Sequence, residues 1–241
     1  RLKIKSGVVL KLMEFGFDGQ GNVPEDLYPQ RIQGATLFRG QYYPEAMYDQ
    51  WNKLHQRIRE KGIQSVYEEV AYTWFNRIVA IRILQKNQLI QPVLQFVEGY
   101  TRMPQIVFDA KRGRYPQMTT EERMRLQNAL QDESRVVEQF SILLTAFCHS
   151  NPILNNCFGR VADYTELLLP NDILADGGFI DMLNNTEHIT DEDYKTTELL
   201  GWLYQFYISE RKDEVNKLDE WSAEDIPAGT QIFTPNWIVK Y

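Results

Sequence analysis

Two neighbouring stretches of the chain carry apolar side chains at helical spacing, and this pattern constrains the fold more than any other feature. In the first, which follows Pro44 and ends at Lys61-Gly62, apolar residues recur at i, i+4, i+7 and i+11: Met47, Trp51, Leu54 and Ile58. The second runs to about Gln88 and keeps three- and four-residue steps through Val66, Val70, Trp74, Ile78 and Ile81. Such steps place side chains on one helix face, so we predict two amphipathic helices.

A third, long helix is indicated by its start signal. Thr119-Thr-Glu-Glu122 has the sequence of a capping box, in which a hydroxyl and a carboxylate satisfy the first backbone N–H groups of a helix. Apolar residues continue at helical spacing to about His149, and Asn151-Pro152 is a stop signal. We therefore predict one helix over this whole range.

The next part of the chain is interrupted more often. Residues 164–183 predict short helices separated by Pro170 and Gly177-Gly178. Thr190 to Asp193 is a weaker capping box, with Asp in place of Glu or Gln. It predicts a helix that reaches about Lys217.

The first forty residues mix short apolar runs, such as Val8-Val9-Leu10, with glycine and proline, so we expect strand or loop there. The predicted fold class is mainly α, a multi-helix N-terminal domain with a small irregular or β element at its start. We expect an irregular or short-strand segment at 1–44, a helical domain at 45–218, an acidic, turn-rich linker at 219–229 and the opening of a further domain at 230–241.

Composition and charge exclude several classes of protein. The formal net charge of −7 argues against a surface that binds nucleic acid over its whole extent, because phosphate neutralisation needs clustered Lys and Arg. There is no apolar run of transmembrane length and no signal-peptide pattern, so we expect a soluble, cytoplasmic protein without a membrane partner. Cys148 and Cys157 form no CxxC unit, and we expect reduced thiols.

The end of the sequence reads as the beginning of a further structural element. Ile226-Pro227 and Ala228-Gly229 have turn chemistry. Thr234 stands directly before Pro235, and proline is favoured at the first position of a helix because its missing N–H would be unpaired there. We expect Thr234 to cap a helix whose apolar face includes Trp237, Ile238 and Tyr241.

The run Phe233-Thr234-Pro235 resembles the motif that opens the methyltransferase domain of adenine-N6 DNA methyltransferases. Longer segments, at 72–82, 164–174 and 200–215, look like the corresponding parts of the PglX-like methyltransferases of BREX phage-defence systems. The resemblance implies a larger enzyme that uses S-adenosylmethionine (SAM) on double-stranded DNA and works with other phage-defence subunits. It also implies that the chain is truncated at the beginning of the methyltransferase domain.

The sequence lacks the motifs that methyl transfer requires. It contains neither the Gly-rich turn that lets backbone approach SAM nor the Asn-Pro-Pro-Tyr run that holds a flipped adenine. By the resemblance, Phe233, Thr234 and Pro235 would be part of a SAM site. We therefore expect no catalytic residue, no bound cofactor and no activity from this chain alone.

Lys111, Arg112 and Arg114 flank Gly113, with Tyr115 beside them, and this grouping suits a clamp on backbone phosphates. The alternative interpretation is a solvated charged loop. The three histidines His55, His149 and His188 are scattered in the sequence, and we expect no metal site.

Two other classes of function remain open. Asp109-Ala-Lys111 after an apolar run, with Glu68-Glu69 or Glu45 as earlier acids, is a loose match to a metal-dependent nuclease, as in the nuclease or spacer region of a fused type II restriction-modification enzyme. The chain would otherwise be a pure protein-interaction module. Arg77 and Glu210 are a hypothetical ion pair between two helices. Aromatic side chains form dense stripes on the predicted helices, and we expect them to be core: Trp74, Phe75, Trp202, Tyr204, Phe206 and Tyr207.

Overall fold

The computed structural model describes residues 2–159, 161, 163–196, 199, 201, 212, 215–217, 220–221 and 226–230. The chain divides into two compact units, Arg1–Thr186 and Glu187–Tyr241. This division falls inside the predicted 45–218 segment, and the domain boundaries set from the sequence stay predictions.

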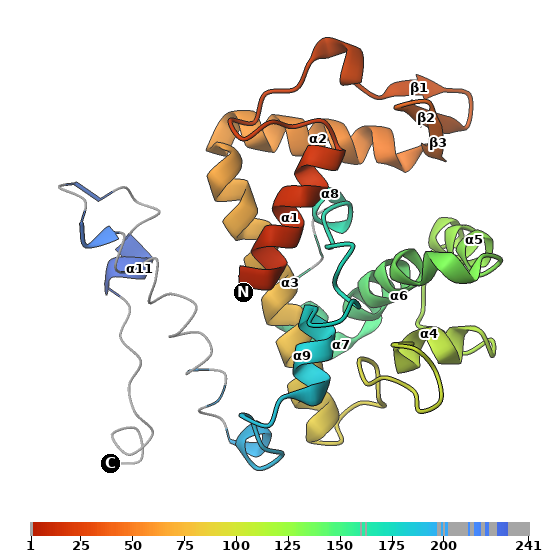
Figure 1. Ribbon diagram of the computed structural model, residues 1–241, viewed down its shortest axis with the longest axis vertical. Coiled ribbons are helices and arrows are strands. Elements are labelled where there is room, and N and C mark those ends of the chain that lie inside the picture. The colour runs from red at the N-terminus through yellow and green to blue at the C-terminus, as the bar shows by residue number, and fades with distance from the viewer. Residues whose placement is uncertain are drawn as a thin grey trace. The chain divides into compact units, whose positions relative to one another are not determined.

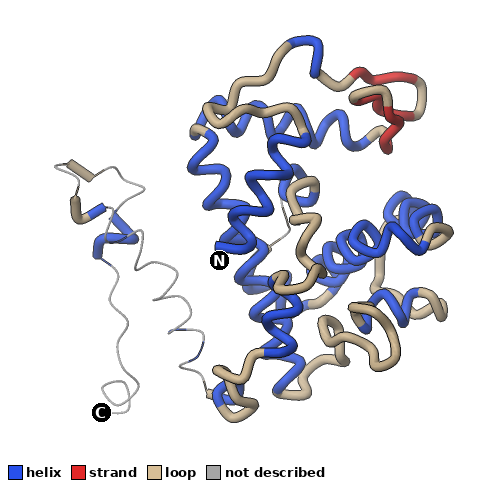
Figure 2. Tube along the Cα trace, viewed as in Figure 1, coloured by secondary structure: helices blue, strands red, loops and turns tan. Residues whose placement is uncertain are grey.

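The first unit is mainly α-helical, which confirms the predicted fold class (Figures 1 and 2). Its α-helices are α1 (Leu2–Glu14), α2 (Ala46–Lys61), α3 (Ile63–Lys86), α4 (Gln105–Ala110), α5 (Thr120–Ala129), α6 (Val136–Ser150), α7 (Pro152–Phe158), α8 (Asp163–Glu166) and α9 (Phe179–Asn185). Two short 3-10 helices are η1 (Glu25–Leu27) and η2 (Glu133–Arg135). The strands are β1 (Gln30–Ile32), β2 (Ala35–Phe38) and β3 (Gln41–Pro44).

The strands confirm the small β element predicted near the start. They form an antiparallel sheet in the order β1-β2-β3 that leads directly into α2. Arg39 and Gly40 both take positive φ, 49° and 75°, as the two-residue turn between β2 and β3 requires. The buried Thr36 hydroxyl lies 3.1 Å from the carbonyls of Pro44 and Glu45 and accepts from the Tyr48 N–H, so the sheet holds the first turn of α2.

Residues 2–14 form a helix, so the expectation of strand or loop there was wrong. α1 buries Ile4, Val8 and Leu12, which are spaced by four residues, and it packs beside α3 (Figure 1). The β-branched run around Val8 favours a strand locally, whereas the four-residue spacing of the buried side chains requires a helix. Packing against α3 decides between them.

The helices α2 and α3 lie where the apolar periodicity predicted them and form the centre of the core. Trp51 on α2 and Trp74 on α3 are fully buried. Each indole N–H finds a backbone carbonyl, Phe15 for Trp51 and Thr165 for Trp74, both at 3.1 Å. Gly62, at φ 79°, separates the two helices.

The predicted capping box is confirmed, but the single long helix is not. Glu122 N–H donates to Thr119 Oγ1 at 3.2 Å, and Thr119 N–H donates to Glu122 Oε2 at 2.7 Å. The helix they start, α5, ends at Ala129, and α6 begins only at Val136.

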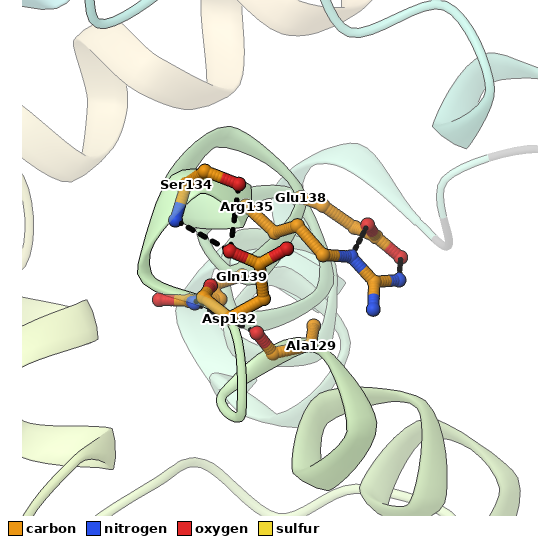
Figure 3. Close-up of polar contacts among 6 residues, drawn as sticks. All are labelled: Ala129, Asp132, Ser134, Arg135, Glu138 and Gln139. Atoms are coloured by element: carbon orange, nitrogen blue, oxygen red, sulfur yellow. Dashed lines mark hydrogen bonds and ion pairs between the residues drawn. The ribbon is translucent and has the colours of Figure 1, made fainter.

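The break between α5 and α6 is held by side chains that bond to backbone (Figure 3). Asp132 Oδ1 accepts from the backbone N–H of Ser134 at 2.9 Å and from its hydroxyl at 2.6 Å. The buried Gln139 amide donates to the carbonyls of Ala129 and Asp132, both at 2.9 Å. The Asx turn at Asp132 thus replaces helical backbone bonds at this point. The break is stabilised because the buried Gln139 amide donates to carbonyls that the break takes out of the helix.

Asn151-Pro152 ends α6, as predicted, and also begins α7. Asn151 Oδ1 accepts from the Leu154 N–H at 3.1 Å and caps α7, with Pro152 at its first position. Pro170 and Gly177-Gly178 separate α8 from α9, which confirms the predicted short helices. A Cβ on Gly178 would lie 2.3 Å from the Asp172 carbonyl oxygen, so this position needs glycine.

In the second unit the structure describes η3 (Asp193–Lys195) and α11 (Ile226–Thr230). The weaker capping box is formed: Asp193 Oδ2 accepts from the Thr190 N–H, and Thr190 Oγ1 accepts from the Asp193 N–H. It opens a 3-10 helix, and most of the helix predicted to reach Lys217 lies outside the described residues. Residues 226–229 belong to α11, where the sequence had indicated a turn.

Candidate nucleic-acid interface

The three predicted DNA-contact residues lie in the tight turn that ends α4. Gly113, at φ 79°, takes the left-handed conformation that L-residues rarely adopt. Its N–H bonds to the carbonyl of Ala110 at 2.9 Å, and the Arg114 N–H bonds to the carbonyl of Asp109 at 3.0 Å. This pair of bonds is the Schellman motif of helix C-termini. The cations are therefore carried by a backbone with fixed geometry.

Arg114 is held by Asp109 of α4, and Gln105 of the same helix bonds to that carboxylate. Its Nη2 lies 2.6 Å from Asp109 Oδ1, and Gln105 Nε2 donates to the same oxygen at 3.1 Å. The Arg114 side chain remains 68% exposed. Because a guanidinium has five N–H donors, the bond to Asp109 leaves donors that face solvent.

Arg112 is positioned by stacking. Its guanidinium carbon lies 3.9 Å from the centroid of the Phe108 ring, which is close enough for a cation–π contact. Phe108 in turn meets Tyr100 edge to face at 5.3 Å. Among the described residues Arg112 makes no ion pair with a carboxylate, so its N–H groups remain available for an anion.

Lys111 makes a looser contact. Its Nζ lies 3.6 Å from Glu133 Oε1, which belongs to η2. The Glu133 side chain is 93% exposed. An ion pair of this kind contributes little because water screens it, so the lysine can exchange Glu133 for another anion.

An open groove of about 610 Å³ lies beside the turn, and we call it the Tyr115 groove. Arg114 and Asp109 line it together with Val93, Gln105, Ile106, Tyr115, Pro116 and Phe147. The Tyr115 side chain is 37% exposed. The Arg123 guanidinium lies 5.4 Å from the Tyr115 ring centroid.

The sequence placed the three cations correctly in one loop but missed what surrounds them. It treated Asp109 as a candidate nuclease acid, whereas Asp109 holds Arg114. It missed Glu133 and Gln105 altogether. The Asp109–Arg114 spacing across a glycine was a usable signal for the first contact, but no local signal pointed to Glu133, which comes from another element.

Glu68 and Glu69, two of the carboxylates proposed for a nuclease, bond to other side chains. Glu68 pairs with Lys5 at 2.5 Å, and Glu69 accepts from Arg57 at 2.7 Å and from the Tyr164 hydroxyl. Within the described ranges no three His, Cys, Asp or Glu side chains gather as metal ligands.

Arg77 is buried and bonds to backbone carbonyls. Its Nη2 donates to Phe158 at 3.0 Å and Gly159 at 3.3 Å, at the end of α7, and its guanidinium lies 5.4 Å from the Phe158 ring. Burial lowers the pKa of this guanidinium. Glu210, the hypothetical partner, lies outside the described residues, as do Phe233, Thr234 and Pro235.

The two cysteines are free, as expected, with Cys148 buried and Cys157 exposed. Where the chain is described, none of its helices combines the length and apolar character needed to cross a membrane.

Comparison with known proteins finds relatives of the chain among adenine-specific methyltransferases. No protein-family model matches it. Over its whole length it is 34% identical to the adenine-specific methyltransferase BrxX of Escherichia coli O9:H4 (strain HS) and spans 20% of that protein. Over 75% of its length it is 33% identical to the adenine-specific methyltransferase PglX of Lacticaseibacillus casei (strain Zhang), of which the match covers 16%. The resemblance to PglX-like proteins is thereby confirmed, and the chain is a relative of one part, about a fifth or less, of these adenine-specific methyltransferases.

Proposed function

We propose that this chain is the non-catalytic N-terminal region of a SAM-dependent adenine-N6 DNA methyltransferase of a BREX phage-defence system. In this proposal the whole protein methylates double-stranded DNA in the cytoplasm, and the turn at 111–114 holds the DNA backbone. Phe233, Thr234 and Pro235 would contribute to the SAM site together with residues that this sequence does not contain. The similarity to BrxX over the whole chain supports the enzyme class.

The observation that carries the DNA contact is the way one rigid turn presents three cations. The Schellman bonds of Gly113 and Arg114 fix the backbone, so little conformational entropy is lost when an anion binds. Arg112 and Arg114 are each held on one side, by Phe108 and Asp109, with donors left over. Pre-positioned guanidinium groups suit phosphate oxygens, which accept such donors in pairs.

The acidic net charge of −7 is compatible with this assignment because only one edge of the protein is involved. Exposed ion pairs such as Lys111 with Glu133 contribute at most about 1 kcal/mol, and a phosphate can replace the carboxylate. The proposal therefore predicts weak, salt-dependent binding.

The test is the affinity of the purified chain for a duplex at several salt concentrations. The triple variant Lys111→Ala, Arg112→Ala, Arg114→Ala should bind more weakly. Its slope of log affinity against log salt should be smaller by roughly 0.9 for each phosphate that the variant no longer neutralises. A matched variant with Lys3, Arg59 and Lys195 changed to Ala removes the same charge from exposed positions elsewhere and should bind as the unmodified chain does.

Equal reductions of affinity in the two triple variants would mean that only net charge matters and that the turn does not touch DNA. In the intact methyltransferase the same turn variants should reduce methylation at elevated salt. Unchanged methylation, together with no salt-dependent binding by the chain, would remove the DNA-contact role.

A protein-docking role is a second candidate because α1 exposes apolar side chains. Leu2, Leu10 and Met13 are 66%, 58% and 50% exposed, and Leu10 and Met13, three residues apart, share one face of the helix. Soluble surfaces with grouped apolar side chains often contact partners, here other phage-defence subunits. Leu10→Glu with Met13→Glu should then abolish association with those subunits and leave DNA binding unchanged. Association that survives both substitutions would rule out this face.

A further inference from the structure

The Tyr115 groove has the size and lining of a small-ligand site and lies directly against the proposed phosphate contacts. Its volume of about 610 Å³ falls within the range of about 300–1,000 Å³ typical of such sites. Its apolar lining includes Ile106, Pro116 and Phe147. Tyr115 supplies an aromatic wall that is still 37% exposed.

The polar side chains that line the groove, Gln91, Gln105, Asp109 and Arg114, supply both donors and acceptors. Gln105 Nε2 and Arg114 Nη2 both donate to Asp109 Oδ1. Within the described residues no hydrogen bond occupies Asp109 Oδ2 or Gln105 Oε1. Arg114 keeps solvent-facing N–H groups. A planar ring with donors and acceptors on its edge and apolar faces matches this lining.

We propose that the Tyr115 groove receives one nucleobase turned out of the DNA duplex whose backbone the 111–114 turn holds. The inference rests on the proposed DNA contact and names what lies beside it. The base stacks on Tyr115, as bases do on exposed aromatic side chains. Its edge meets Gln105, Asp109 and Arg114.

The covalent order of the loop supports this arrangement. Arg112 and Arg114 flank Gly113, and Tyr115 follows immediately, so the proposed phosphate contacts at 111–114 lie at most four residues from the stacking ring. The Arg123 guanidinium lies 5.4 Å from the centroid of the Tyr115 ring and positions the ring by a cation–π contact. In a nucleotide the phosphate and the base are joined through one sugar, so a phosphate contact and a stacking ring that are close in the chain can bind both.

The experiment compares two duplexes that carry 2-aminopurine, a fluorescent base analogue, either paired with thymine or placed opposite an abasic site. The unpaired base leaves the stack easily, so the purified chain should bind that duplex about tenfold more tightly. The emission of 2-aminopurine should change on binding because the base moves from its neighbours onto Tyr115.

Tyr115→Ala should abolish the preference and the emission change, whereas Tyr115→Phe keeps the ring and should retain both. Tyr42→Ala removes a tyrosine that is 74% exposed on β3 and is the matched control, expected to behave as the unmodified chain. Circular dichroism of each variant confirms that it is folded.

Equal, salt-dependent affinity for both duplexes without an emission change would overturn the base site and leave the backbone contact standing. Absence of binding to either duplex would remove the backbone contact and the base site together. Micromolar binding of free dAMP that disappears in Tyr115→Ala would assign the groove to a mononucleotide and overturn the assignment to DNA.

Discussion

The indole Nε1–H of Trp74 on α3 donates a hydrogen bond of 3.1 Å to the backbone carbonyl of Thr165 on α8, 91 residues further along the chain. Trp74 is 0% exposed and Thr165 is 2% exposed, so water does not replace either partner. The two residues lie in separate segments, 72–82 and 164–174, that resemble PglX-like methyltransferases. One buried bond thus joins two segments that are far apart in the sequence.

Trp74→Phe should destabilise the chain by about 1–3 kcal/mol, because it removes one of the two donors to the buried Thr165 carbonyl, which keeps the Leu168 N–H, and removes part of a packed ring. Urea unfolding followed by circular dichroism measures the change. Trp221→Phe is the control, since Trp221 is 41% exposed, and it should change the free energy of unfolding by less than about 0.5 kcal/mol. Equal effects would show that the Trp74 bond is not special.

Gly7→Ala should be destabilising although it lies inside a helix. Alanine is favoured over glycine there by about 1 kcal/mol of helix propensity. A Cβ at this position would lie 2.4 Å from the Cβ of Pro170, so α1 must move away. We expect a net destabilisation of about 1–3 kcal/mol in thermal or urea unfolding. Ser6→Ala, on the exposed side of α1, should be neutral, and a stabilised Gly7→Ala protein would contradict the close packing of α1 on Pro170.

Gln139→Leu should destabilise the break between α5 and α6. The substitution removes the amide donor from the carbonyls of Ala129 and Asp132, which then keep only longer bonds of 3.3 and 3.2 Å from backbone N–H groups (Figure 3). We expect a loss of about 0.5–1.5 kcal/mol for each hydrogen bond removed. Gln127→Leu at an exposed position of α5 is the matched control. If both variants unfold at the same urea concentration, the amide does not hold the break.

Tyr164 predicts a loss of stability at alkaline pH. Burial and then its hydrogen bond to Glu69 raise the pKa of Tyr164 to about 12. An unfolded tyrosine titrates near 10, so between about pH 10 and 12 the unfolded chain releases this proton while the folded chain keeps it. Stability is therefore full below about pH 10 and falls as pH rises, by about 2–3 kcal/mol for this group.

The measurement is urea unfolding from pH 8 to 12 of the unmodified chain and of Tyr164→Phe. The other tyrosines and both thiols titrate in the two proteins alike, so their contributions cancel. The free energy of unfolding of the unmodified chain should exceed that of Tyr164→Phe at pH 8, and this difference should shrink as pH rises. A difference that stays constant would show that the Tyr164 hydroxyl has an ordinary pKa in the folded protein.

The two thiols should differ sharply in reactivity. Burial raises the pKa of the Cys148 thiol to about 12, whereas Cys157 is exposed. Because the thiolate is the reactive form, a disulfide reagent at pH 8 should modify one thiol per native chain and the second only in denaturant. Cys157→Ser should remove the fast reaction. If both thiols of the native chain reacted fast, Cys148 would be reached by the reagent, and α6 would open readily.

The candidate site was predictable in its sequence-local part. Lys111, Arg112 and Arg114 were recognised because they are adjacent to one another and to Gly113, whose turn brings them together without help from distant residues. The carboxylate at Glu133 and the apolar lining at Phe147 were not recognised, because η2 and α6 approach α4 only in the folded chain.

The same distinction runs through the fold. The sequence by itself determined the helices α2 and α3, the capping box at Thr119 and the stop at Asn151, because these follow from spacing and from bonds within a few residues. Tertiary structure decided that residues 2–14 are helical and that the helix from Thr119 breaks after Ala129. In the first case burial against α3 overrides the strand preference of a β-branched run, and in the second the buried Gln139 amide satisfies carbonyls that an uninterrupted helix would have used itself.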